Sequence, residues 1–142
     1  MAALSTFHYT PGLVFRKTVH SAIEATIAEA SVKAELCAGA KAISVVITEG
    51  GTVNNRSGAF TFYVSNDGVT FVQYNMVIDN VTNTNGQMPT RIATKTRNSA
   101  GSDVVFFDPA TLGGVTYFKV VPTITDGGAP TGNFTVEANI AY

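Results

Sequence analysis

The sequence predicts an all-β protein: an antiparallel β-sandwich or jelly roll of about seven or eight strands, with an N-terminal arm or short helix. Apolar and polar residues alternate with a period of two over most of the chain from about residue 33 onward. Short segments rich in Gly, Asn, Asp and Ser separate the alternating runs. No convincing crossover helix joins successive runs, which argues against a parallel α/β sheet.

The alternating runs mark the expected strands. The last run, residues 133–142, is the most regular and places Phe134, Val136, Ala138, Ile140 and Tyr142 on one face. Side chains that are apolar on one face and polar on the other suit an antiparallel sheet with one buried face. The other clear runs cover residues 43–48, 60–65, 72–78 and 117–121.

Turn chemistry separates the strands. Ser65-Asn66-Asp67-Gly68 lies between two strong runs and predicts a tight hairpin, because Asn, Asp and Gly tolerate positive φ. The polar stretches 80–89 and 126–130 are expected to form exposed loop tips.

The start of the chain differs from the rest. We expect residues 1–31 to form an N-terminal arm or short helical segment and residues 32–142 to form the sandwich domain. Phe7, Tyr9 and Phe15 lie on a stretch that also contains a Thr-Pro-Gly sequence, which favours an extended arm.

The second half of this segment allows more than one structure. Val19, Ile23, Ile27 and Ala30 would share one stripe of a helix. Ile23, Ala25 and Ile27 also fit the alternation of a strand. A short helix, an extended arm and a first strand of the same domain therefore all stay open.

Composition narrows the classes of function. Only 13% of the residues are charged, and the formal net charge is −1, which argues against binding to nucleic acid. No run approaches 18 apolar residues, so no membrane-spanning helix is expected. The first ten residues lack the basic and apolar regions of a signal peptide. A single Cys rules out a disulfide within the chain.

Candidate chemistry is sparse. His8 and His20 do not lie at metal-ligand spacing from each other, from the Cys or from an acidic residue. Cys37 carries no signature of a nucleophile and is expected to act as a small apolar residue. No pair of carboxylates stands out as catalytic. We therefore predict no catalytic residue, no cofactor and no metal, and expect that the protein is not an enzyme.

The most informative stretch is AFTFYVSNDGVTFVQYN, residues 59–75. Upstream of it lie Leu36, Gly39, Lys41 and the strand 43–47, ISVVI, followed by a Gly-Gly turn. Downstream lie the late strand 117–121 and a closing strand from Phe134. Over residues 32–142 this pattern resembles small tailed-bacteriophage virion proteins, the capsid decoration or cement proteins.

The hairpin also resembles one found in discoidin-like carbohydrate-binding sandwiches. The chain departs from that family because it has no Trp and has one Cys where the family has a bracketing pair. The virion resemblance is therefore the stronger of the two.

The virion resemblance implies a structural protein that decorates and stabilises a capsid by binding subunits of the major capsid protein. It also implies a homo-oligomer, for which a trimer fits, on the exterior of the virion after synthesis in the host cytoplasm. We predict that the arm from Ala2 to Phe15 makes the protein interface, with Phe7, Tyr9 and Phe15 as anchors.

Two alternatives stay open. One is another self-assembling subunit, such as a phage tail or extracellular filament protein. The other is a glycan-binding module, for which Tyr63 and Tyr74 are the side chains to test.

Overall fold

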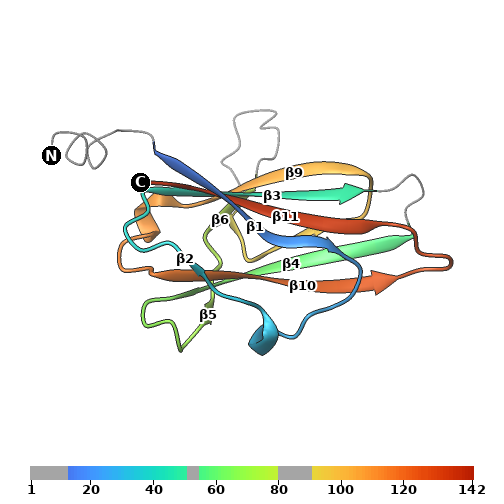
Figure 1. Cartoon of the computed structure of the whole chain (residues 1–142), viewed down its shortest axis with the longest axis horizontal. Helices are drawn as coiled ribbons and strands as arrows, with labels where there is room; N and C mark the ends of the chain where they lie inside the picture. Colours follow the sequence, from blue (N-terminus) through green and yellow to red (C-terminus); the bar gives the residue numbers. More distant parts are fainter. Residues whose placement is uncertain (1–12, 51–54, 80–90) are drawn as a thin grey trace, which may run out of the picture.

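The computed structural model describes residues 13–50, 55–79 and 91–142, and in these ranges it has two antiparallel sheets that pack face to face (Figure 1). The six-stranded sheet has the order β1-β11-β3-β9-β6-β7, and the five-stranded sheet has the order β2-β10-β4-β5, with β8 also paired to β4. The predicted all-β sandwich is confirmed.

The strands of the two sheets differ greatly in length. The six-stranded sheet contains β1 (Val14–Ile23), β11 (Asn133–Ala141), β3 (Ala42–Gly50), β9 (Gly101–Phe107), β6 (Val77–Asp79) and β7 (Arg91–Ile92). The five-stranded sheet contains β2 (Glu35–Leu36), β10 (Tyr117–Asp126), β4 (Arg56–Ser65), β5 (Val72–Gln73) and β8 (Thr94–Arg97). This count exceeds the expected seven or eight because strands of two or three residues are too short to show a period.

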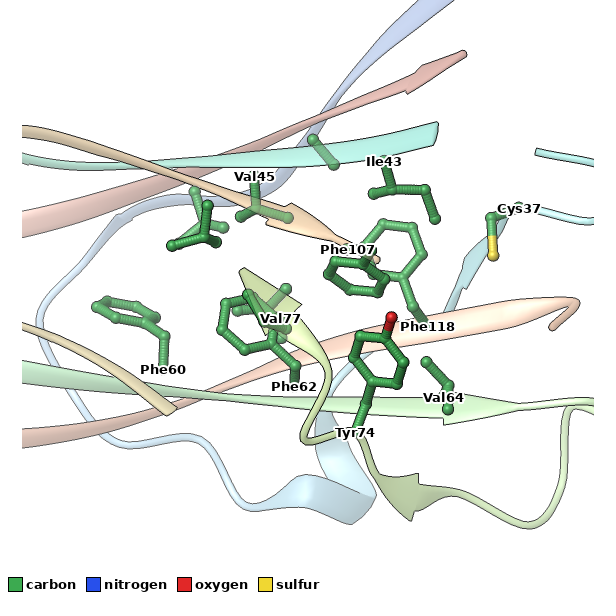
Figure 2. Packing of buried hydrophobic residues seen from close by; sticks show 14 of the residues in the cluster. Cys37, Ile43, Val45, Phe60, Phe62, Val64, Tyr74, Val77, Phe107 and Phe118 are labelled. Carbon is green, nitrogen blue, oxygen red and sulfur yellow. The ribbon is translucent and has the colours of Figure 1, made fainter. Parts of the chain in front are cut away.

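The core lies between the sheets and follows from the alternation. Five phenylalanines are fully buried there: Phe60, Phe62, Phe107, Phe118 and Phe134. Phe107 lies centrally, with ring centroids 5.7 Å from Phe62 and 5.6 Å from Phe118, both edge-on (Figure 2). The face predicted for the last strand is correct, since its residues 134, 136, 138 and 140 are all buried.

The predicted strand over residues 72–78 is wrong, because the chain crosses from one sheet to the other within it. β5 pairs with β4, whereas β6 pairs with β9 in the opposite sheet. Tyr74 stands at the crossing, stacked on Phe107 at 4.8 Å (Figure 2). The hydroxyl of Tyr74 accepts a hydrogen bond from the Asp108 amide and also pairs with the Thr111 hydroxyl. The alternation of residue types does not reveal this crossing, because it continues through residues 72–78 while burial changes phase: Val72 is exposed, whereas Tyr74 and Val77, three residues apart, are buried.

The helical interpretation of the segment from Val19 is wrong. Residues 14–23 form β1, an antiparallel partner of β11, and a single 3-10 turn covers Glu29–Ser31. His20 fixes this strand to the other sheet, because its Nε2 lies 2.6 Å from the Val120 carbonyl oxygen. Pairing along β11 outweighs the modest helix propensity of the segment. The described part of the predicted arm is therefore integral to the sandwich.

The predicted hairpin is present, with a longer loop than a tight turn. Val64 and Val72 form the last pair between β4 and β5, so residues 65–71 make the connection. Gly68 has φ +77°, as its turn position requires. Asp67 Oδ1 accepts hydrogen bonds from the amides of Val69 and Thr70, each at 2.8 Å.

Candidate interaction surface

The exposed large apolar side chains of the described residues gather at one end of the sandwich, where the C-terminus and the β4–β5 hairpin lie (left in Figure 1). Strand pairing fixes this placement. β1 and β3 begin where β11 and β9 end, and β10 begins where β4 ends. Six side chains belong to this group: Val14, Phe15, Leu36, Val69, Val72 and Phe106, which are between 43% and 84% exposed. We call this region the apolar end.

A shallow groove of about 490 Å³ opens on the outer face of the six-stranded sheet at the apolar end. Its walls include Val14 on β1, Ala141 on β11, Ala42 on β3 and Phe106 on β9. Among the described residues that line this groove none is charged, and the polar side chains are Ser44 and Asn139. Such a site is suited mainly to apolar groups.

A second groove of about 430 Å³ lies at the same end, beside β1 and β2. It is lined by Leu13, Phe15, Lys17, Leu36 and Tyr142. The ring of Phe15 meets that of Tyr142 edge-on at 5.6 Å, so one wall is aromatic. We call it the β1–β2 groove.

One ion pair borders the β1–β2 groove. Lys17 Nζ lies 3.7 Å from a carboxylate oxygen of the buried Glu35 on β2. This ion pair links the edges of the two sheets. Lys17 is the charged member of the described residues that line the groove, and none of them is acidic.

The opposite end of the sandwich is charged. Arg56 pairs with Asp126 at 2.6 Å, and Arg97 pairs with Asp103 at 2.7 Å. Glu49 is 3% exposed beside this group, and burial raises the pKa of its carboxyl, an effect that Arg97 partly offsets. The two ends therefore differ in chemistry, and apolar partners are expected at only one of them.

The structure places one of the three predicted anchors. Phe15 is half exposed on β1 and lines the β1–β2 groove. Phe7 and Tyr9 lie outside the described residues, as does the loop predicted at 80–89. The predicted tip at 126–130 is exposed throughout.

Sequence reasoning missed Leu36 and Phe106 as surface residues. The signal for Phe106 is present in the sequence Val-Val-Phe-Phe at 104–107, because four consecutive apolar residues in a strand must direct two outward. Leu36 carried no such signal. Its exposure follows from its position on a two-residue strand at the edge of the sheet.

The surroundings of Cys37 do not suit it to catalysis. Cys37 is buried as expected, and burial raises the pKa of its thiol to about 11, although Lys17 acts in the opposite direction. Its thiol is therefore protonated at neutral pH and unsuited to nucleophilic attack. Within residues 13–50, 55–79 and 91–142, no three His, Cys, Asp or Glu side chains converge as metal ligands, and no helix could cross a membrane.

Comparison with known proteins gives one likeness of fold. The crystal structure of the SPBc2 prophage-derived protein YomS superposes with a TM-score of 0.57. The match covers 94% of this chain and 96% of that chain, at 16% sequence identity. This chain therefore shares its fold, over nearly its whole length, with a protein of prophage origin. No protein-family model and no curated protein matches the sequence.

Proposed function

We propose that this protein is a structural component of a phage particle that decorates and stabilises the capsid by binding subunits of the major capsid protein. The proposed location is the capsid exterior, and the proposed role is binding without catalysis. The likeness to YomS supports a phage origin through the fold alone.

The apolar end carries the proposal. Burying exposed side chains such as Phe106 and Leu36 against a partner would release about 25 cal/mol for each Å² of apolar surface removed from water. Their grouping at one end of the sandwich, beside the groove that Val14 and Phe106 line, provides one face for attachment. A protein that stands on a shell requires such a face on one side only.

The positions of the two candidate tyrosines give less support to a glycan-binding function. Tyr74, a candidate for stacking on a sugar ring, is buried at the sheet crossing, and its hydroxyl is engaged by Asp108 and Thr111. Among the candidate tyrosines only Tyr63 points outward, from β4.

Mass spectrometry of purified phage particles tests the proposed function. We expect this protein in the particles at a copy number close to that of the major capsid protein. A copy number of a few per particle would indicate a component of the tail, and absence from the particles would refute a structural role. Electron microscopy of the isolated protein adds a second test, because filaments formed by the protein alone would favour a filament subunit.

A further inference from the structure

β1 is an edge strand that can accept another strand. Among the described residues its neighbour in the sheet is β11, and it stands last in the strand order. The Tyr142 amide donates a hydrogen bond to the Leu13 carbonyl, so residues 13 and 142 form a hydrogen-bonded pair. Because such pairs alternate along an antiparallel ladder, the main-chain groups of Val14, Arg16 and Thr18 point away from β11, toward the free edge.

The β1–β2 groove lies directly beside this edge. A strand added to β1 would direct alternate side chains inward, past Phe15 and toward Leu36 on β2. The space is open only at the apolar end. Farther along, the chain that follows β1 crosses to the second sheet, where Ile27 and Thr26 are hydrogen-bonded to Pro122 and Ile124 of β10.

The first residues of the chain have the composition that this groove requires. Residues 1–12 contain no Asp, Glu, Lys or Arg. Phe7 and Tyr9 are two residues apart, so in an extended strand both side chains point to the same face. The described chain begins at Leu13, which itself lines the groove, and twelve extended residues span about 40 Å.

The sequence just before β1 bears on whether the first residues pair with the same copy or with a second one. Pro11-Gly12 immediately precedes Leu13. A two-residue hairpin loop requires a type I′ or II′ turn with positive φ at its first position, and Pro fixes φ near −65°. The Pro-Gly sequence therefore disfavours a two-residue hairpin onto β1 of the same copy, whereas pairing with the edge of a second copy requires no such turn.

We infer that residues 4–10 of one copy add as a strand to the free edge of β1 in a second copy, with Phe7 and Tyr9 in its β1–β2 groove. The exchange makes the protein a homo-oligomer held by main-chain hydrogen bonds and two aromatic anchors. This inference does not depend on the capsid as a partner, because it concerns contacts between copies of this chain.

Light scattering coupled to size-exclusion chromatography tests the exchange on the full chain. We expect a mass that is a multiple of the single-chain 14.9 kDa. Deletion of residues 1–12 and the substitution Leu36→Glu should each shift the protein to the monomer. Leu36 is 49% exposed, so a charge there blocks the groove without entering the core. Circular dichroism should confirm that both variants stay folded.

Val72→Glu is the matched control. Val72 is 58% exposed on another two-residue strand of the same sheet, outside the groove, so this variant should keep the oligomeric mass. A mixture of the deletion variant, which lacks the donor, with Leu36→Glu, which lacks the acceptor, should yield a mixed dimer. A monomeric full-length protein, an oligomer that survives the deletion, or equal effects of the two Glu substitutions would overturn the inference.

Discussion

Glycine is required at position 68 for two reasons, the positive φ of the backbone and the close approach of the Tyr117 ring. Its φ is +77°, and a Cβ built on it would lie 2.9 Å from the ring of Tyr117. The loop that carries Val69 at the apolar end therefore depends on a residue without a side chain.

We expect Gly68→Val to destabilise the fold by about 1–3 kcal/mol, because a β-branched residue is strained at positive φ and would press on Tyr117. Thermal unfolding followed by circular dichroism measures the loss. Gly113→Ala is the control, since a Cβ there meets nothing within 4 Å, and its melting temperature should stay close to that of the wild type. An unchanged melting temperature for Gly68→Val would contradict the turn geometry.

Asp67 in the same loop makes stability depend on pH. Hydrogen bonds from the amides of Thr70 and Val69, and then from the Ser65 hydroxyl, lower the pKa of its carboxyl from 3.8 to about 2. Because the pKa in the folded state is below the unfolded value, the ionised carboxylate stabilises the fold above pH 4. This contribution is lost as the pH falls from about 4 to about 2.

We therefore expect Asp67→Asn to lower the melting temperature most near pH 6 and hardly at all at pH 2. Melting curves of both proteins between pH 2 and pH 7 measure the difference. A gap that stays constant across this range would show that the charge of Asp67 does not matter.

At the scale of elements, the crossing between β5 and β6 ties the two sheets together. Tyr74 stacks on Phe107, and its hydroxyl accepts from the Asp108 amide at 3.1 Å. The same amide also donates to the Met76 carbonyl at 3.2 Å, so the main chain and the side chain of the crossing segment both bind Asp108.

We expect Tyr74→Phe to cost about 0.5–1.5 kcal/mol, because it keeps the ring but removes the hydrogen bonds of the buried hydroxyl with the Asp108 amide and the Thr111 hydroxyl, while the Asp108 amide keeps the Met76 carbonyl as an acceptor. Denaturant unfolding measures the change in free energy. Tyr63→Phe, on the outward face of β4, provides the comparison and should change stability by less than about 0.5 kcal/mol. Equal effects of the two substitutions would mean that the hydroxyl of Tyr74 has no special role.

At the scale of the whole molecule, the contrast between the apolar end and the charged end predicts which end of the sandwich would face the capsid shell. Phe106 and Ser102 lie on the same strand and the same outward face, four residues apart, with Phe106 nearer the apolar end. A change to Glu at each of these two positions therefore tests which end of the protein faces the shell.

We expect Phe106→Glu to weaken binding to assembled capsid shells at least about tenfold, which corresponds to about 1.4 kcal/mol. Ser102→Glu should bind as the wild type does. Co-sedimentation of each protein with shells measures the bound fraction. If Ser102→Glu weakens binding more than Phe106→Glu, the proposed orientation is reversed.

Much of the fold could be predicted from local patterns. The strands that became β3, β4 and β11 were visible as alternating runs, because each has one face in the core and one outside. The strand β10 was also visible from its residue types, although residues 118–122 of it are all buried. The turn at Gly68 was visible because few residue types accept its φ. The strand β1 could not be separated from a helix, since its apolar residues fit both periods.

The sequence by itself determined the fold class, the faces that β3, β4 and β11 bury, and the scarcity of charge. These properties depend on residue types and their spacing along the chain. Only the tertiary structure decided that residues 72–78 cross between sheets, that β1 is an edge strand beside a groove, and that Leu36 and Phe106 are exposed at the same end of the sandwich. These properties depend on which strands become neighbours. A local pattern does not show the partner of a strand, whether it is near in sequence, as for Val64 and Val72, or far, as for Val14 and Ala141.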